Sequence, residues 1–221
     1  MKAFYKLQEG LYDPNIFKAF FMAGGPGSGK SYVAGKTTAG LGLKVVNSDD
    51  IFERYLKQAR LSFEMPDAQA AKRNERRTAA KEVTDKRRDN YVEGRLGMVI
   101  DGTGKDYGKI TSLASQLKIL GYDTHMIFVN TSLDVALERN KKRARQVPEK
   151  IVINSWNQVQ QNIGSFQRFF GNKNFIVVDN NDAGEDILGK AYKEVRRMLR
   201  KKVDNHIAKA WMANQLRLKQ R

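Results

Sequence analysis

The chain reads Gly24-Gly25-Pro26-Gly27-Ser28-Gly29-Lys30-Ser31 directly after an apolar run over residues 16–23. This stretch fits the pattern G-x-x-x-x-G-K-[ST], and the residues that follow it, up to Gly40, are expected to form a helix. Glycines let the backbone curl so that successive N–H groups face phosphate oxygens, and the helix dipole adds positive charge. The stretch therefore predicts an ATP site in which Lys30 reaches the outer phosphates and Ser31 ligates Mg²⁺. A glycine-rich turn without a ligand is the alternative.

Length and composition limit the classes of protein to which the chain can belong. A chain of 221 residues with 41% hydrophobic and 29% charged residues is expected to form one domain, residues 1–221, and not to be disordered throughout. The absence of cysteine excludes a disulfide framework and a thiolate metal site, and two histidines are too few for a His-rich metal centre. No apolar run approaches the roughly 18 residues of a membrane span. We therefore expect a cytoplasmic protein.

The charge of the chain is strongly basic and unevenly distributed. Lysine and arginine outnumber aspartate and glutamate by 40 to 24, which gives a net charge of +16. Residues 190–221 contain eleven basic and two acidic residues and so carry more than half of this excess. Such a segment attracts polyanions, with nucleic acid as the favoured partner and an anionic membrane surface as the rival. A tail that aids only solubility or assembly is the third alternative.

Short apolar stretches alternate with helical stretches along the chain. The stretches expected to form strands are residues 16–23, 43–47, 98–101, 124–130 and 174–179. This alternation predicts an α/β fold, a parallel sheet wrapped by helices. Polar residues follow the carboxyl end of each strand, which is where open α/β sheets bind their ligands.

Two further segments are expected to be helical. Residues 51–95 form an insertion between the second and third strands, in which Asp67 caps a helix that reaches Glu93. Its nearly balanced charges favour a solvated helix over an arm that faces the substrate. Apolar residues that recur every three or four positions from Leu188 to Trp211 predict one long basic helix over residues 182–221. Its apolar stripe is expected to pack on the sheet or on another subunit, with a membrane anchor as the weaker alternative.

Acidic residues follow the second and third predicted strands. Asp49 and Asp50 face the phosphate-binding loop, where a general base accepts a proton from an attacking hydroxyl. Catalysis is favoured for Asp49, whereas capping of the next helix is equally favoured for Asp50. Asp101, which precedes Gly102 and Thr103, suits the magnesium shell or an acceptor contact, although an aspartate in a turn is equally ordinary.

A pair of arginines follows the fourth strand. Arg139 and Arg143 are four residues apart and are expected to share a helix face, so that both guanidinium groups point at one spot. That arrangement would stabilise the charge on a transferring phosphoryl group. The alternative is a solvated basic helix end.

The order of these motifs resembles a known family. Gly-x-Pro-Gly-Ser-Gly-Lys-Ser, Asn-x-Asp-Asp, a strand with Asp and Thr, and Arg-Asn-x-x-Arg before Val-Pro resemble the kinase domain of bacteriophage polynucleotide 5′-kinases, over about residues 20–164. More broadly the chain is similar to the P-loop kinases that include zeta toxins. The resemblance implies a three-layer P-loop NTPase fold with a parallel sheet of order 2-3-1-4-5 and a lid over the nucleotide. It also implies a phage protein in the host cytoplasm.

The resemblance assigns roles to individual residues. Lys30 and Ser31 would hold ATP and Mg²⁺, Asp49 would be the base, and Arg139 and Arg143 would be the lid arginines.

The chain also departs from the family's pattern on the acceptor side. Phe52 stands where the polynucleotide kinases have an arginine that grips the acceptor, with Arg54 two positions later, and Asp101 is displaced by one position. The acceptor contacts are therefore expected from Asp50, Arg54 and Thr103.

These observations predict an ATP- and Mg²⁺-dependent kinase that phosphorylates a hydroxyl of a nucleic acid, at a 5′ end or on a modified base. The first alternative is a kinase for a nucleoside, a nucleotide or a nucleotide sugar. The second is a structural or assembly protein that binds the nucleotide without turnover. That function would not require the acidic pair Asp49-Asp50 together with Arg139 and Arg143.

Overall fold

The computed structural model describes residues 11, 13, 15–64, 66–182 and 184–219. Within these residues, five parallel strands form one sheet in the order β2-β3-β1-β4-β5. The strands are β1 (Lys18–Ala23), β2 (Lys44–Val46), β3 (Met98–Asp101), β4 (Asp123–Asn130) and β5 (Phe175–Asp179). The expected α/β class and the strand order implied by the resemblance are both confirmed.

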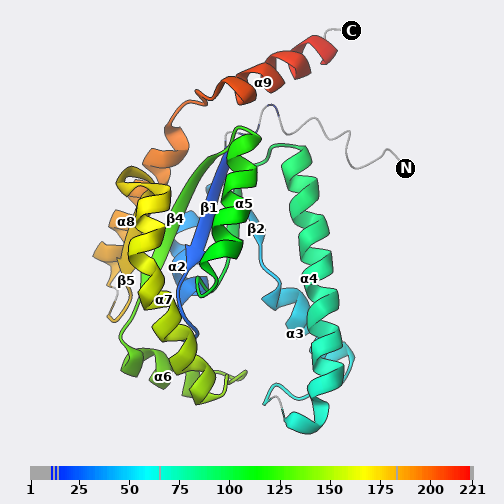
Figure 1. Cartoon of the computed structure of the whole chain (residues 1–221), viewed down its shortest axis with the longest axis vertical. Coiled ribbons are helices and arrows are strands. Elements are labelled where there is room, and N and C mark those ends of the chain that lie inside the picture. Colours follow the sequence, from blue (N-terminus) through cyan, green and yellow to red (C-terminus); the bar gives the residue numbers. More distant parts are fainter. Residues whose placement is uncertain (1–10, 12, 14, 65, 183, 220–221) are drawn as a thin grey trace.

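Helices cover both faces of the sheet. They are α2 (Lys30–Thr38), α3 (Asp49–Gln58), α4 (Ala70–Glu93), α5 (Tyr107–Ile119), α6 (Leu133–Lys141), α7 (Glu149–Phe170), α8 (Glu185–Arg200) and α9 (His206–Lys219), with short 3₁₀ turns η2 (Asp67–Gln69) and η3 (Asn172–Asn174). Helices α5 and α7 lie on one face and α2 and α8 on the other, which makes the three layers seen in Figure 1. Among the described helices, none has the length and apolarity that crossing a membrane requires.

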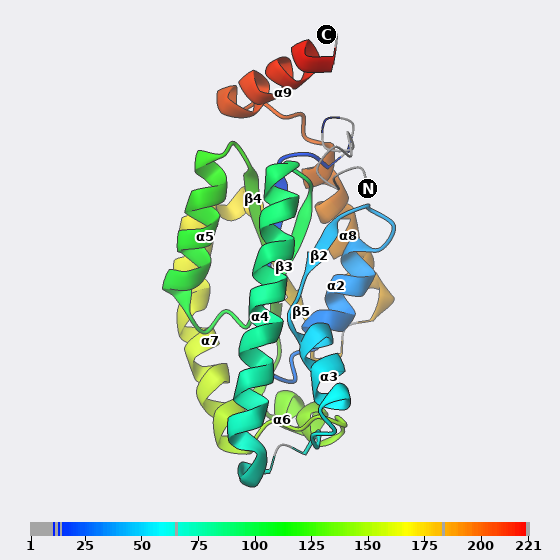
Figure 2. The ribbon, with the colours of Figure 1, turned by 90° about the vertical axis from the view of Figure 1, so that its right-hand side faces the viewer.

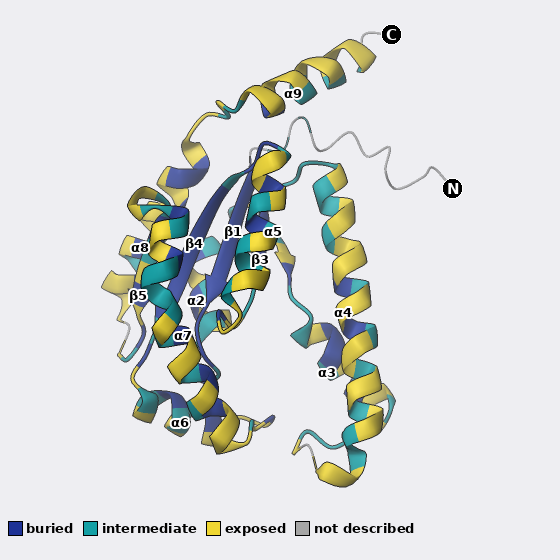
Figure 3. Cartoon of the chain, viewed as in Figure 1, coloured by how far each residue is buried: buried dark blue, intermediate teal, exposed yellow. Residues whose placement is uncertain are grey.

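The core alternates along each strand, as a sheet buried on both faces requires. In β1, Phe21 packs on the side of α5 and α7, whereas Phe20 packs on the side of α2 and α8. Figure 3 shows β1 and β4 as buried along their length. Polar side chains are buried in the same core, Lys18 and His125 among them. Lys18 is buried and forms an ion pair with Asp123 at 2.5 Å, and His125 stacks on Phe20.

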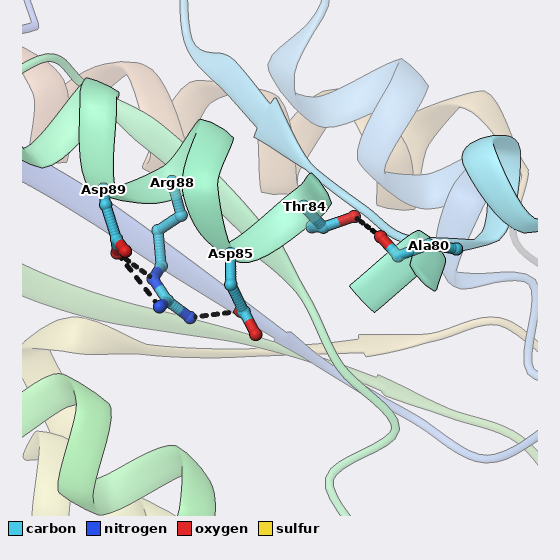
Figure 4. A network of polar contacts seen from close by, with 5 residues as sticks. All are labelled: Ala80, Thr84, Asp85, Arg88 and Asp89. Atoms are coloured by element: carbon cyan, nitrogen blue, oxygen red, sulfur yellow. Dashed lines mark hydrogen bonds and ion pairs between the residues drawn. The ribbon is translucent and has the colours of Figure 1, made fainter. Parts of the chain in front are cut away.

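The insertion forms a small core of its own beside the sheet. Phe52 and Leu56 of α3 pack against Ala80 of α4, and α4 runs along the β2 edge of the sheet and past α3 (Figure 2). The other side of α4 faces solvent. There Arg88 forms ion pairs with Asp85, one turn earlier, and with Asp89, the next residue (Figure 4). The expectation that Asp67 caps this helix is wrong, because η2 precedes α4 and α4 begins at Ala70.

The expectation of one long C-terminal helix is also wrong. Helix α8 ends at Arg200, Lys201 has extended backbone angles, and Asn205 accepts a hydrogen bond from the backbone N–H of Ile207 at 2.9 Å as α9 begins. The physical reason is that the apolar stripe serves two clusters. Val195 of α8 packs on the α2 side of the sheet, whereas Trp211 of α9 packs with the opposite cluster, 5.5 Å from the ring of Phe17. A straight helix could not reach both.

Candidate active site

The phosphate-binding loop lies between β1 and α2 in a curled conformation that only glycine adopts without strain. Gly27 and Gly29 have φ values of 80° and 79°, and a Cβ on Gly27 would lie 2.1 Å from the carbonyl oxygen of Ala136 in α6. The side-chain amide of Asn180 donates to the carbonyl of Ser28 at 2.7 Å. Contacts with α6 and with the end of β5 thus hold the loop, and α2 begins at its end without an acidic residue in the first turn. Its amides and dipole therefore favour an anion.

Lys30 folds back over this loop. Its ammonium donates to the carbonyl oxygen of Gly24 at 2.7 Å. Burial lowers the pKa of Lys30, while the carboxylates of Asp101 and Asp49 act in the opposite direction. An ammonium held by loop carbonyls beside two carboxylates is well placed to exchange those carbonyls for phosphate oxygens.

One cavity of about 450 Å³ brings together most of the residues that the sequence singles out. Its lining includes Lys30, Ser31, Asp49, Asp101, Thr103, Arg139 and Arg143. Two residues that were expected to contact the acceptor lie outside this lining. Asp50 and Arg54 are exposed on α3 and are not among the residues that line the cavity, and the guanidinium of Arg54 lies 5.8 Å from the ring of Tyr55.

Asn47 connects the two acidic strand ends. Its Nδ2 donates to Oδ2 of Asp101 at 3.0 Å, and its Oδ1 accepts from the backbone N–H of Asp49 at 2.7 Å. Asn47 also lines the cavity. The sequence places Asn47 beside the acidic pair without predicting a role for it, because an asparagine after a strand is as common in a plain turn.

Asp101 and Ser31 line the same cavity and carry oxygen atoms of the kind that Mg²⁺ binds. Burial raises the pKa of Asp101, the neighbouring Lys30 acts in the opposite direction, and Oδ1 of Asp101 is buried without a hydrogen-bond partner. Mg²⁺ commonly binds through one or two protein oxygens and takes its remaining ligands from phosphates and water. Among the described residues no group of three or more His, Asp or Glu side chains could hold a metal, so Mg²⁺ at this place would depend on a bound polyphosphate.

Arg139 and Arg143 both line the cavity, although they do not share a helix face. Arg139 donates to the carbonyl oxygens of Asn180 and Asn181, at 2.6 and 2.8 Å. Helix α6 ends at Lys141, and Arg143 lies in the exposed connection between α6 and α7. The expected helical spacing is therefore wrong for this pair, because the helix ends between them, yet the turn still directs Arg143 to the cavity.

Two arginines that the sequence analysis does not single out complete the site. Arg145 forms ion pairs with Asp49 at 3.2 Å and with Glu53 at 3.5 Å. Arg77 of α4 lines the cavity, and its guanidinium lies 4.6 Å from the ring of Phe52, which Arg145 also approaches, at 5.6 Å. Both arginines stand in basic runs whose spacing does not distinguish them from solvated neighbours.

A second cavity of about 300 Å³ adjoins the first at Arg143. Besides Arg143, it is lined by Glu53 and Lys57 of α3, by Phe63, and by Ala144 and Arg145. It therefore lies between the insertion and the connection from α6 to α7.

Comparison with known proteins places this architecture in a family. Residues 20–165 match the model of a family described as the AAA domain. The chain belongs to this AAA domain family. A search of curated proteins by sequence found no match.

Solved structures that resemble this AAA domain include several kinases. The gluconokinase of Sinorhizobium meliloti 1021 has a TM-score of 0.51 at 15% identity, covering 84% of this chain and 95% of that chain. The shikimate kinase of Bacteroides thetaiotaomicron has a TM-score of 0.51 at 11% identity, covering 82% and 97%. A chain of the Pnkp1/Rnl/Hen1 RNA repair complex has a TM-score of 0.52 at 18% identity, covering 69% of this chain and 47% of that chain. At these identities the likeness concerns the fold, which is that of the P-loop kinases.

The C-terminal helix of the chain, α9, lies far from the phosphate-binding loop. Helix α9 packs beside Gly121, just before β4 begins, whereas the loop follows the carboxyl end of β1 (Figure 1). The eight residues of β4 span about 26 Å at 3.3 Å per residue. The helix and the cavity are therefore at opposite ends of the sheet.

Proposed function

We propose that this AAA domain is an ATP- and Mg²⁺-dependent kinase that transfers the γ-phosphate of ATP to an alcohol hydroxyl. The observation that carries the proposal is the single cavity that Lys30, Asp49 and the pair Arg139 and Arg143 line from separate elements. A protein that only bound the nucleotide would need the loop, but it would need neither a carboxylate nor two arginines opposite the loop.

In this proposal each group of residues has a separate role in phosphoryl transfer. The loop amides and Lys30 bind the phosphates, and Arg139 and Arg143 stabilise the negative charge that spreads over the moving phosphoryl group. The acceptor oxygen forms a bond to the γ-phosphorus as the bond to the bridging oxygen of ADP breaks, and the hydroxyl proton passes to the Asp49 carboxylate. Mg²⁺, when bound by Ser31 and Asp101, would neutralise phosphate charge.

The acceptor we propose first is a nucleic acid that bears a free 5′-hydroxyl. The net charge of +16 supports an anionic polymer, as do Arg77 and Lys57 at the two cavities. In the second cavity, Phe63 offers a ring on which a base can stack. Thr103 lines the first cavity and remains an acceptor contact in this proposal.

The position of α9 favours a second candidate, an acceptor that is a free nucleoside, nucleotide or nucleotide sugar. Helix α9, with Lys209, Arg217 and Lys219, lies at the end of the sheet away from the cavity, so the charge of these residues does not act beside the acceptor. A small acceptor would need only the cavity of about 300 Å³.

Transfer of label from γ-labelled ATP tests the activity. Oligonucleotides with 5′-hydroxyl ends, nucleosides, mononucleotides and sugars are offered as acceptors, and the labelled product is identified by thin-layer chromatography. Lys30→Ala and Asp49→Asn should each reduce labelling by about a hundredfold or more. Lys36→Ala, which removes an exposed lysine from the same helix as Lys30, should label as the wild type does. Normal labelling by Lys30→Ala or Asp49→Asn would contradict the proposal.

Salt dependence separates the two acceptor classes. Residues 190–221 cannot simply be deleted, because Val195 and Leu199 of α8 belong to the core. The test variant instead combines three substitutions at exposed positions, Lys201→Gln, Lys202→Gln and Arg217→Gln. If these residues bind the polymer, the slope of log affinity against log salt should fall by about 0.9 for each phosphate that the variant no longer neutralises. An unchanged slope, together with full competition by an unlabelled mononucleotide, would favour the small acceptor.

A further inference from the structure

Arg145 is buried in a segment that is otherwise open to solvent. Its residue exposure is 7%, whereas its neighbours on the connection from α6 to α7, residues 142–144 and 146, are exposed. Burial of a guanidinium is costly unless the charge is paired. The fold therefore directs this one side chain inward, to carboxylates on another element.

Those carboxylates belong to one face of α3. Asp49, Phe52 and Glu53 lie three and four residues apart, a spacing that places them together on a helix. Nη2 of Arg145 lies 3.2 Å from Oδ1 of Asp49, and Nε lies 3.5 Å from Oε1 of Glu53. The guanidinium also lies 5.6 Å from the ring centre of Phe52. Arg145 is thus held by two carboxylates and by an aromatic ring.

The backbone around Arg145 is fixed from the other direction. Asn140 is buried, and its side chain donates to the carbonyl of Val147 at 2.7 Å and accepts from the N–H of Val147 at 3.0 Å. The side chain of Gln146 donates to the carbonyl of Lys141 at 2.9 Å. These bonds close the connection into a compact loop, so that Arg145 projects from a fixed base.

We propose that Arg145 is a positioning residue that sets the orientation of the Asp49 carboxylate for proton transfer, a role that rests on the proposed kinase function. The ion pair engages Oδ1 of Asp49, and in this proposal Oδ2 accepts the proton of the acceptor hydroxyl. Asn47 fixes the backbone of Asp49 through its N–H, and Arg145 fixes the side chain. Arg145 is not among the residues that line the cavity of the phosphate-binding loop, so we assign it a role through Asp49. A misplacement of about 1 Å at a reacting group can cost about a hundredfold in rate, so this contact bears on turnover.

Steady-state kinetics with a 5′-hydroxyl oligonucleotide, or with whichever acceptor is labelled, tests the role. Arg145→Gln should lower kcat by about tenfold or more while the KM for ATP changes by less than about twofold. Arg145→Lys keeps the charge without the planar fork and should recover part of the lost kcat. Lys142→Gln is the matched control, because it removes a cation from the same loop whose partner is the exposed Glu138. It should leave kcat unchanged.

Two kinetic results would overturn the proposal. One is a kcat for Arg145→Gln within twofold of the wild type. The other is a rise in the KM for ATP that matches the fall in kcat, since that would make Arg145 a nucleotide-binding residue.

A measurement without turnover separates this inference from the proposed function. The unfolding midpoints of Asp49→Asn, Arg145→Gln and the double variant form a double-mutant cycle. A coupled pair predicts that the shift of the double variant is smaller than the sum of the single shifts. Additive shifts would overturn the positioning role even in an active kinase. Coupled shifts in a protein that labels no acceptor would instead mean that the ion pair stands and the kinase function fails.

Discussion

The side chain of Asn47 donates a hydrogen bond to Oδ2 of Asp101 at 3.0 Å, from the end of β2 to the end of β3. The same side chain accepts the backbone N–H of Asp49 at 2.7 Å. Asn47 thus contacts both Asp101, the proposed magnesium ligand, and Asp49, the proposed base. Oδ1 of Asp101 is buried without a hydrogen-bond partner. Asn47 therefore orients this carboxylate through Oδ2 and leaves Oδ1 available to the proposed metal ion.

We predict that Asn47→Ala raises the Mg²⁺ concentration needed for half-maximal labelling by about tenfold, because the partner that orients a metal ligand is removed. The variant should also lose about 1 kcal/mol of unfolding free energy. A magnesium titration at saturating ATP and urea unfolding measure the two effects. Asn162→Ala is the control, since Asn162 bonds the carbonyls of Gly104 and Lys105 in the loop after β3 without touching either carboxylate. An Mg²⁺ requirement equal in both variants would refute the role of Asn47.

We predict that Gly27→Ala abolishes tight ATP binding. A side chain at this position requires φ near 80° and places its Cβ 2.1 Å from a backbone oxygen of α6, so the loop must open. Strain of this kind costs about 1–3 kcal/mol, and calorimetry should find the dissociation constant for ATP raised at least about tenfold. Gly35→Ala is the matched control within α2. No atom lies within 4 Å of its added Cβ, and alanine is the better helix former, so stability should rise by up to about 1 kcal/mol with ATP affinity retained.

We predict that Asp123→Asn destabilises the fold by about 3–5 kcal/mol, because it leaves the Lys18 ammonium buried without a countercharge. The Lys18 side chain is 2% exposed and the Asp123 side chain is 27% exposed. Lys18→Met should therefore cost less, since the remaining carboxylate can reach water. Urea unfolding of the two single variants and of the double variant measures the asymmetry. Equal losses of unfolding free energy in the two single variants would show that the difference in burial between Lys18 and Asp123 does not determine the cost of breaking the ion pair.

We predict that stability falls as the pH is lowered from about 6.5 to about 4, in part through His125. Burial lowers the pKa of His125 to about 4, against about 6.5 in an unfolded chain. Between these values the unfolded chain binds the extra proton, so unfolding becomes more favourable as pH falls, by about 3 kcal/mol over the whole interval. Urea unfolding from pH 4 to pH 7.5 measures this dependence.

The contribution of His125 is isolated by substitution. His125→Leu should flatten the dependence of stability on pH over this interval, and His206→Gln, at an exposed position, should keep the slope of the wild type. A slope that is the same in His125→Leu and in the wild type would assign the pH dependence to other groups.

Much of the fold was accessible from the sequence because its signals are local. The apolar runs become the strands with ends shifted by one or two residues, and the glycine-rich stretch after residue 23 becomes the turn before α2. Lys30, Ser31, Asp49 and Asp101 meet in one cavity because parallel strands bring their carboxyl ends to one edge of the sheet. The prediction for residues 182–221 failed because periodicity records an apolar stripe and does not record which cluster each half of the stripe contacts.

The sequence by itself determined the phosphate-binding loop, since its glycines dictate their own backbone angles, and it determined the strands, since two-sided burial demands continuous apolar runs. Only the tertiary structure showed which arginines besides Arg139 and Arg143 lie at the two cavities. Arg77 and Arg145 stand in basic runs like any solvated helix or loop, and they become distinct because α4 and the connection before α7 both close on Phe52. Such convergence depends on packing between elements distant in the chain, and local spacing does not encode it.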